Sequence, residues 1–345
     1  MILKKMNHED LYNVLAYINT KGRFFSTLPL TIESIALQTV KPTKLLIFDD
    51  NDDPSNIVEL PTYKNLFNIL KEKNIDWEVR QGMKSGQHKN HEIANTMADF
   101  NLAWRVDDDE IPEANVLEKL LTHMVVGVGA VAGAVLVPGM ILHGEGAVKL
   151  EDMFTLPNVQ WMKGKEVLYV EHLYSSFLYR THLVHYESRL SPMAHREETI
   201  FSHELYRKGY KLVVDQSAIT WHLRYPEGGI RNYPSQFGIH DEMVFREKLK
   251  EWKTEFPVLV LLDNDINAHH AFCSILPELE TRHKKITIAC NFPEVFSNTK
   301  HKIVKAATVN QMCGVEKYNI YDAMKKWDWQ GNLSDAFRKM YLSFN

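Results

Sequence analysis

The chain has 345 residues, of which 45% are hydrophobic and 24% charged, values typical of a globular protein with a sizeable core. Its 40 basic and 44 acidic side chains give a formal net charge of −4, which excludes a global basic field for recruiting nucleic acid. The three cysteines, Cys273, Cys290 and Cys313, match no metal-ligand spacing and fit a reducing compartment better than a disulfide framework.

Two apolar stretches bear on localisation. The opening residues 1–14 lack the continuous apolar core of a signal peptide. The most apolar stretch, Met124–Leu142, is interrupted by glycines and prolines, so we interpret it as buried strands and turns and not as a membrane span. We therefore expect a cytoplasmic protein, with peripheral association at the inner face of the membrane left open.

Apolar stretches alternate with amphipathic ones along the first part of the chain, which predicts an α/β domain with a mostly parallel sheet. The expected strands are Asn13–Asn19, Lys44–Phe48, Asp76–Arg80 and the run Leu102–Val106. The expected helices are Leu28–Gln38, Tyr63–Lys73, one that follows Gly82–Asn90, and Ala114–His123 with Pro112 suited to its first turn.

Four consecutive carboxylates, Asp107 to Glu110, directly follow the run that contains Trp104. Two carboxylates about 4 Å apart repel each other by about 1 kcal/mol in water, so the cluster indicates a solvated turn or a bound cation. Mg²⁺ or Mn²⁺ suits it, since a few carboxylates hold such ions together with substrate phosphates. Ligands of open α/β sheets bind at the carboxyl ends of strands, which favours the metal. The spacing alone leaves both interpretations open.

A second expected strand also ends in acids. The acidic residues after Lys44–Phe48 are Asp49, Asp50, Asp52 and Asp53. Because parallel strands bring their carboxyl ends to one rim of a sheet, the two acidic clusters would lie near each other. Their coincidence strengthens the metal hypothesis.

The loop Gly82–Asn90 supplies the opposite charge. It places Lys84, His88 and Lys89 close to glycines and just ahead of a helix. Backbone N–H groups and a helix N-terminus in this position suit a phosphate, although a basic surface loop is at least as common.

In this order the motifs resemble those of family 2 glycosyltransferases with the GT-A fold. The matching stretches are the strand ending at Thr20, ESIALQTVKP, LLIFDDND, GQHKNHEIA, WRVDDDE, REETIFSHELYRKGYKLVVD and ITWHL. They run from Val14 to Arg231, about two thirds of the chain. The resemblance implies a metal-dependent, inverting hexosyltransferase that uses a nucleotide diphosphate sugar, most often UDP-linked. Its acceptor would be a glycan, a lipid-linked glycan or another glycoconjugate.

The resemblance also implies a donor site at the strand ends. The residues that it places around the nucleotide and its diphosphate are Thr20, Asp49 or Asp50, Lys89, Asn90, Asp107 and Asp108. The second acidic motif reads DDNDD where the family has Asp-Asp-Gly-Ser, a departure at the ribose end of the site.

Metal ligands and the catalytic base follow from the same resemblance. Asp107 and Asp109 fall on the metal-binding motif, and His222 in TWHL falls on a histidine that often completes the metal or diphosphate site. Glu197 and Glu198 stand where the family has Glu-Asp, whose second carboxylate is the base. Glu198 is thus the expected base and Glu197 the second candidate. The structural alternatives are first-turn helix acids and a core histidine.

These roles agree with the chemistry of sugar transfer. A departing diphosphate needs positive charge, which a metal ion supplies as a Lewis acid. The acceptor hydroxyl needs a carboxylate to take its proton, and such a base typically contributes about 10²–10⁴-fold in rate. Attack on the face opposite the leaving group inverts the anomeric centre.

Two further segments are candidates for contact with substrates. The aromatic stretch before the base contains Trp161, His172 and Tyr174, which are candidates for acceptor contact, although such a cluster is more often core. The glycine- and proline-rich stretch after His222 predicts a mobile loop in which Arg224 and Arg231 could close over the diphosphate.

A change of organisation is expected near residue 255, after a charged helix over Phe237–Lys253. We expect a GT-A domain over residues 1–255 and a small α/β module over 256–345. The module's expected elements are a strand after Pro257, the helix Ala268–Glu280, the strand Lys285–Cys290 and a last helix Leu333–Leu342. They resemble the opening part of a Rossmann-like half of a GT-B heptosyltransferase without its glycine-rich loop. We interpret the module as a degenerate accessory unit.

Two other functions remain as alternatives. A nucleotidyltransferase also combines a Rossmann-like sheet with acidic metal ligands, but INTKGRFF is a poor version of its glycine-rich basic signature. A catalytically inactive protein that binds sugar nucleotides or glycans is the second alternative. Carboxylates at Asp107, Asp109 and Glu198 argue against it.

Overall fold

The computed structural model describes residues 13–52, 57–229, 233–252, 258–262, 266–282, 286–290 and 292–305. The chain divides into two compact units. The first consists of Met1–Gly144 with Val159–Phe245, and the second of Glu145–Asn158 with Arg246–Asn345. The boundary between the units falls inside helix α6 (Ser235–Glu251).

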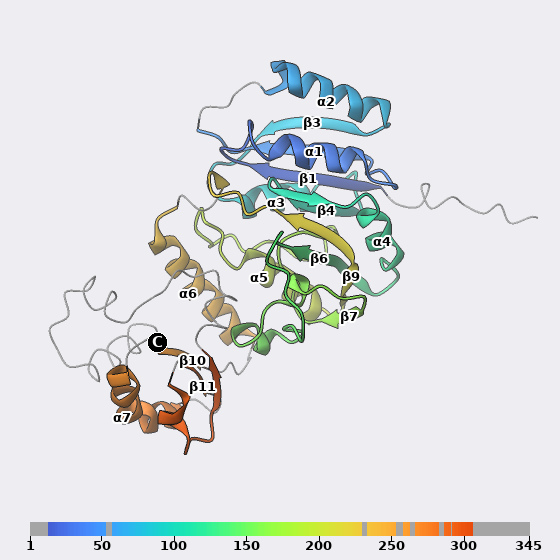
Figure 1. The fold of residues 1–345 in the computed structure, drawn as a ribbon. Helices are drawn as coiled ribbons and strands as arrows, with labels where there is room; N and C mark the ends of the chain where they lie inside the picture. The colour runs from blue at the N-terminus through green and yellow to red at the C-terminus, as the bar shows by residue number, and fades with distance from the viewer. Residues whose placement is uncertain are drawn as a thin grey trace, which may run out of the picture. The chain divides into compact units, whose positions relative to one another are not determined.

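The first unit is built on a nine-stranded sheet in the order β3-β2-β1-β4-β8-β6-β9-β5, with β7 paired to β9 (Figure 1). Its strands are β1 Val14–Thr20, β2 Lys44–Asp49, β3 Asp76–Gln81, β4 Leu102–Asp107, β5 Glu110–Pro112, β6 Val128–Leu136, β7 Val167–Val170, β8 Phe177–Arg180 and β9 Lys211–His222. Strands β1 to β4 pair in parallel, as do β6 and β9, whereas β5, β7 and β8 run antiparallel to their neighbours. The expected α/β class with a mostly parallel sheet is confirmed.

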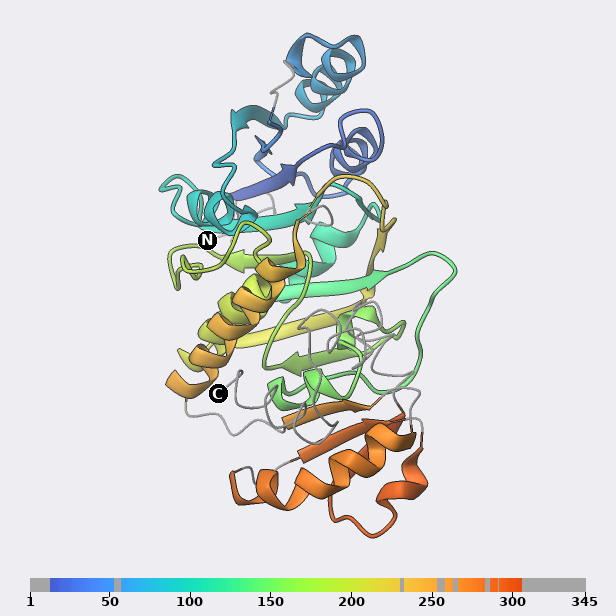
Figure 2. The ribbon, with the colours of Figure 1, turned by 90° about the vertical axis from the view of Figure 1, so that its left-hand side faces the viewer.

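Helices cover both faces of this sheet. Besides α6 they are α1 Leu28–Ala36, α2 Pro61–Glu72, α3 Gln87–Asn95, α4 Val116–Thr122 and α5 Glu197–Arg207. On β1, Ala16 and Ile18 belong to the apolar core formed with α1, α2 and α4. Tyr17 points to the other face, where its ring meets His91 of α3. Figure 2 shows α1 and α3 on opposite sides of the sheet.

Strand register brings the acidic motifs to one rim of the sheet. Thr20 at the end of β1 is paired with Asp49 of β2, and Asn19 is paired with Asp107 of β4. The acidic motif that begins at the end of β4 continues into β5, where Glu110 is paired with His222 at the end of β9. The two acidic clusters therefore meet at a common rim, as the parallel arrangement predicts.

Two local expectations need correction. Pro112 does not open a helix but ends β5, and α4 begins only at Val116. The pairing of β5 with β9 explains the difference, because this antiparallel pairing holds residues 110–112 extended. The apolar stretch after Met124 forms a single strand, β6, with all nine residues buried, followed by turns.

The second unit contains a three-stranded parallel sheet in the order β10-β11-β12. Its elements are β10 Val258–Leu262, α7 Ile266–Arg282, β11 Ile286–Cys290 and β12 Lys302–Lys305. Phe272, Ile288, Cys290 and Phe296 form its buried core. The helix expected over Leu333–Leu342 lies outside the described residues, and the division at residue 255 stays a prediction.

Candidate active site

The acidic turn between β4 and β5 is not a solvated one. Asp108, Asp109 and Glu110 are buried, and only Asp107 keeps a substantial exposed fraction, with 32% of its side chain accessible. Burial of adjacent carboxylates is costly unless positive groups or hydrogen bonds compensate. The surroundings of the turn supply both.

Arg23 neutralises two of these acids. Its Nη1 contacts Asp108 Oδ1 and lies 3.0 Å from Asp109 Oδ1. The same guanidinium donates through Nε to the carbonyl of Glu227, at 3.2 Å. Burial raises the pKa of Asp108 to about 6 despite Arg23, and the charge of Asp109 adds to that shift. Arg23 thus ties the loop after β1, the acidic turn and the loop after β9 together.

Asp109 and His222 lie side by side at this rim. His222 Nε2 is 3.3 Å from Asp109 Oδ1, and the backbone N–H of Tyr225 donates to Asp109 Oδ2 at 3.1 Å. Burial disfavours a charged imidazole, but the hydrogen bond to Asp109 and its charge outweigh it and raise the pKa of His222. A carboxylate oxygen and an imidazole nitrogen at this separation fit a shared cation, since octahedral ligands about 2.1 Å from an ion lie about 3 Å apart.

The expected three-ligand set is only partly assembled. Across the described residues, no three or more His, Cys, Asp or Glu side chains form a group that could hold a metal ion. Asp107 faces Ser175, whose Oγ is 3.3 Å from Asp107 Oδ2 and 2.5 Å from Glu110 Oε1. Burial and the charge of Asp107 raise the pKa of Glu110 to about 7. A cation at Asp109 and His222 would need further ligands from a substrate, as is usual for Mg²⁺.

At the end of β2, a cluster of hydrogen-bonding groups surrounds Asp50. Asn90 Nδ2 donates to Asp50 Oδ2 at 2.8 Å, and the backbone N–H of Lys84 donates to Asp50 Oδ1 at 2.9 Å. Asn90 Oδ1 in turn accepts the N–H of Met83 at 2.8 Å. Burial raises the pKa of Asp50 in spite of these bonds. The structure therefore joins β2 to the basic loop and α3 through one carboxylate.

The remaining donor candidates lie along the same rim. Asp49 Oδ1 accepts from the backbone and the side chain of Asn51, and Asn51 Oδ1 accepts from the N–H of Gly22 at 2.7 Å. Thr20 is buried beside this loop, and its carbonyl accepts the N–H of Asp50. Lys89 is half-buried in the first turn of α3.

Helix α5 delivers two glutamates with different surroundings. Glu197 is fully buried, and Arg105 Nη1 lies 2.8 Å from its Oε1 and 2.9 Å from its Oε2. Glu198 retains 14% side-chain exposure and has Arg105 Nη2 at 3.9 Å from its Oε1. Glu198 is therefore the solvent-accessible member of the pair, whereas Glu197 is buried.

Both glutamates hold protons more tightly than usual. Burial raises the pKa of Glu197 to about 7, against the opposing charge of Arg105. Burial and the charge of Glu197 raise the pKa of Glu198 to about 8. A carboxylate tuned into this range is suited to general-base work near neutral pH.

The start of α5 is fixed from the other side by Asp241 of α6. This fully buried carboxylate accepts the N–H of Ser191 at 2.6 Å, its Oγ at 2.9 Å and the N–H of His195 at 2.7 Å. Arg196, in the left-handed conformation with φ 72°, is the residue before the helix, and its Nε bonds Glu242 at 3.0 Å. The loop before the glutamates is thus held rigidly.

Of the three residues expected to contact the acceptor, Trp161 and Tyr174 are half-buried and His172 is fully buried. The rings of Trp161 and Tyr174 meet edge to face with centroids 5.1 Å apart, and the exposed Arg224 lies over Trp161 at 6.0 Å. His172 is 1% exposed, and burial lowers its pKa to about 3, so it belongs to the core. Arg231 lies outside the described residues.

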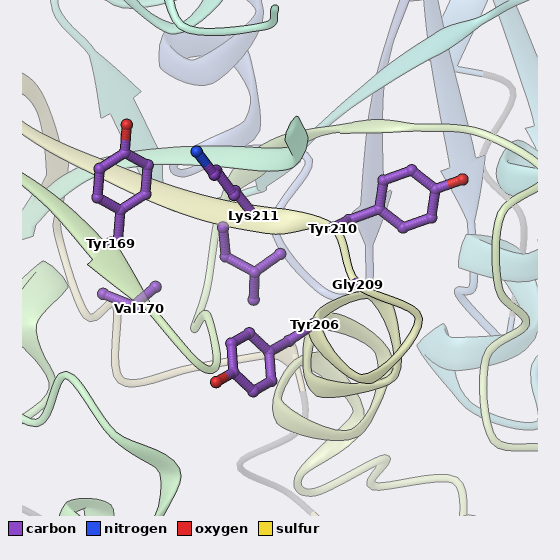
Figure 3. A pocket seen from close by; sticks show the side chains of 7 residues that line it. Tyr169, Val170, Tyr206, Gly209, Tyr210 and Lys211 are labelled. Atoms are coloured by element: carbon purple, nitrogen blue, oxygen red, sulfur yellow. The ribbon is translucent and has the colours of Figure 1, made fainter. Parts of the chain in front are cut away.

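A hollow of about 400 Å³ lies elsewhere in this unit, at the start of β9. Figure 3 shows the rings of Tyr169 and Tyr206 on different sides of it, with Lys211 nearby. His222, at the other end of β9, belongs to the acidic rim. The hollow is therefore separate from the clustered carboxylates.

Sequence reasoning missed three residues of this site: Arg23, Arg105 and Ser175. A signal existed for Arg105, because a lone arginine inside the apolar strand LAWRVD needs a buried partner. Arg23 and Ser175 carry no such local signal, since tertiary folding alone brings them to the acidic turn.

Comparisons with known proteins agree with the fold. The GalNAc-T7 structure with UDP, GalNAc and Mn²⁺ has a TM-score of 0.50 at 13% identity, over 69% of this chain and 48% of that chain. The structure of S. aureus TarS 1–349 with UDP-GlcNAc has a TM-score of 0.48 at 14% identity, over 69% of this chain and 66% of that chain. Another S. aureus TarS structure has a TM-score of 0.43 at 13% identity, over 62% of this chain and 37% of that chain. The chain thus spans about half of GalNAc-T7, and the likeness shows a shared GT-A fold.

The other comparisons add no family assignment. No family model matches the chain, and no curated protein matches it either. None of the helices that the structure describes is both long enough and apolar enough to cross a bilayer.

Proposed function

We propose that the first unit is a glycosyltransferase that moves a sugar from a nucleotide diphosphate sugar, UDP-linked, to a hydroxyl of a glycan or other glycoconjugate. One observation carries the proposal: the Asp109–His222 pair and the accessible Glu198 flank Asp107 at one rim of a GT-A sheet. The solved structure of GalNAc-T7 with UDP, GalNAc and Mn²⁺ supports the donor class.

The nucleotide would bind where β1, β2 and α3 meet. Asp50 and Asn90 present hydrogen-bonding groups there, and Thr20 lies beside them. Lys84 and Lys89 provide positive charge for the diphosphate at the start of α3, where backbone N–H groups favour an anion. Asp107 and Asp108 would lie between the nucleotide and the transferred sugar.

A divalent cation, Mn²⁺ or Mg²⁺, would be held by Asp109 and His222 together with oxygens of the donor. When bound, the ion supplies positive charge to the departing diphosphate. Arg23, 5% exposed and in contact with Asp109, orients that carboxylate from behind. Such supporting contacts fix the direction of a ligand's lone pairs.

Glu198 would accept the proton of the acceptor hydroxyl as its oxygen attacks the anomeric carbon. The new carbon–oxygen bond forms while the bond from that carbon to the diphosphate breaks, and the nucleoside diphosphate leaves with the electron pair. Attack opposite the leaving group inverts the anomeric centre. Trp161 and Tyr174 would contact the acceptor, because half-buried aromatic rings offer apolar faces that suit sugar rings.

Calorimetric titration of UDP, GDP, CDP and ADP into the full chain, first with Mn²⁺ and then with EDTA, tests this function. We expect UDP to bind with Mn²⁺ present and more weakly in EDTA. Binding of none of the four nucleotides under either condition would contradict the proposal. A nucleotidyltransferase would instead bind nucleoside triphosphates and release pyrophosphate.

We further propose that residues 256–345, the C-terminal part of the expected division, form an accessory module. Its three parallel strands and α7 have the beginning of a Rossmann-like arrangement. Its likeness to a heptosyltransferase half stays a prediction, as does a cytoplasmic or membrane-peripheral location.

A further inference from the structure

Arg105 is the most deeply buried cation at the site, and its position on β4 is unusual. It stands two residues before Asp107 in an otherwise apolar strand, with a side chain 1% exposed. Its guanidinium lies 5.2 Å from the ring of Phe177. Burial of a guanidinium costs several kcal/mol and has to be compensated by the groups around it.

One side of the guanidinium is fully engaged. Arg105 Nη1 contacts both oxygens of Glu197, at 2.8 and 2.9 Å. Glu197 also lies 3.4 Å from His91 Nε2 and accepts from Gln87 Nε2 at 3.4 Å, so helix α3 holds it as well. This ion pair fixes the first turn of α5 against β4.

The other side of the guanidinium is not engaged. Within the part of the chain that the structure describes, Arg105 Nη2 and Nε are buried and make no hydrogen bond. Nη2 lies 3.8 Å from Asp107 Oδ1 and 3.9 Å from Glu198 Oε1, just beyond hydrogen-bond distance of both. A buried donor that makes no hydrogen bond is energetically costly. The position of Nη2 between the carboxylates of Asp107 and Glu198 therefore needs an explanation.

Building on the proposed function, we infer that Arg105 is a positioning residue for the transfer step, which clamps Glu197 with Nη1 and holds Glu198 in line with the acceptor hydroxyl through Nη2. A shift of less than 1 Å brings Nη2 within hydrogen-bond distance of Glu198. The planar fork of arginine is needed, because the single ammonium of lysine cannot hold two carboxylates in fixed directions.

The test compares variants of the full chain by calorimetry with UDP and Mn²⁺, and by UDP release from UDP-glucose, UDP-N-acetylglucosamine and UDP-N-acetylgalactosamine in water. The first variant, Arg105→Lys, keeps a cation for Glu197. The second, Arg105→Met with Glu197→Gln, removes both charges of the Arg105–Glu197 ion pair, so that neither partner is left as an unpaired buried ion. Arg180→Lys is the control, since among the described residues Arg180 Nε and Nη2 bond only the backbone carbonyls of Met124, Val125 and Val128.

We expect both Arg105 variants to bind UDP within about threefold of the wild type and to keep its KM for the donor. Their kcat should fall by about 10- to 100-fold, the scale of a misplacement of about 1 Å. A purely structural role predicts a different result: Arg105→Lys, which keeps a cation beside Glu197, would retain wild-type kcat.

Wild-type kcat in either variant would overturn the inference, and so would a fall in UDP affinity equal to the fall in kcat. A wild-type protein that neither binds UDP nor releases it from these donors would overturn the proposed function, and with it this role of Arg105. Unchanged values for Arg180→Lys show that the effect belongs to Arg105 and not to arginine loss in general.

Discussion

Asp50 at the end of β2 and Asn90 in α3 are joined by a hydrogen bond of 2.8 Å, which closes the nucleotide end of the proposed site. The packing behind this bond leaves no room for a side chain at Gly82. A Cβ there would lie 2.1 Å from Asp50 Oδ1 and 3.0 Å from Asn90 Nδ2. We therefore expect Gly82→Ala to displace both groups and to weaken UDP binding at least tenfold in calorimetry.

Gly238→Ala is the matched control for Gly82→Ala. Within the part of the chain that the structure describes, its added Cβ would meet only Met193, with Sδ at 3.5 Å, an ordinary van der Waals contact. UDP affinity should stay within about twofold of the wild type. Equal affinities for Gly82→Ala and Gly238→Ala would place the nucleotide elsewhere on the chain.

Replacement of Asp109 by Asn tests the proposed cation pair. The amide keeps the shape of the carboxylate but removes the charge beside His222 Nε2, 3.3 Å away. We expect the gain in UDP affinity that Mn²⁺ provides to shrink at least tenfold, while affinity in EDTA stays unchanged. Asp76→Asn, at the start of β3 and exposed, should behave as wild type. An undiminished Mn²⁺ effect in Asp109→Asn would rule out this carboxylate as a ligand.

The elevated pKa of Glu198 gives the reaction a pH dependence of definite sign. A base must be ionised to take a proton, and burial together with Glu197 raises the pKa of Glu198 to about 8. UDP release at saturating donor and Mn²⁺ should therefore fall as the pH drops below about 8, by up to about tenfold per pH unit. A midpoint near pH 4, where an ordinary glutamate titrates, would show that Glu198 is not the group observed.

Asp241 should matter for stability more than any exposed acid. Asp241→Ala removes the acceptor of two buried donors of Ser191 and of the part-buried N–H of His195, so we expect the free energy of unfolding to fall by about 2–4 kcal/mol. Urea denaturation measures the change. Asp99→Ala, at an exposed position, should stay within about 0.5 kcal/mol. Equal effects would mean that the loop before α5 is held by other contacts.

Much of the frame could be predicted from local pattern. Apolar runs followed by acids located β2 and β4, and the parallel arrangement placed Asp49 and Asp107 on one rim. Side-chain periodicity and strand–helix alternation act over short stretches, which is why they can be read from sequence. Glu198 keeps 14% side-chain exposure beside the fully buried Glu197, and its place as first candidate for the base stays a prediction.

The parts that could not be predicted depend on long-range pairing. Pro112 suits a first helical turn by its own chemistry, but pairing with β9 makes it the end of a strand. Arg23 and Asp108 are 85 positions apart, and Arg105 and Glu197 are 92 apart. No periodicity connects such residues, so these ion pairs emerge only from the folded chain.

The most direct test of a glycosyltransferase with Glu198 as its base combines one variant with two readouts. Glu198→Gln should bind UDP with Mn²⁺ as the wild type does, because Glu198 lies outside the proposed nucleotide site. Its UDP release from the UDP-sugar that the wild type prefers should fall at least about 100-fold, the lower end expected for loss of a general base. Wild-type turnover in Glu198→Gln would contradict the account and move the base to another carboxylate, with Glu197 the first to examine.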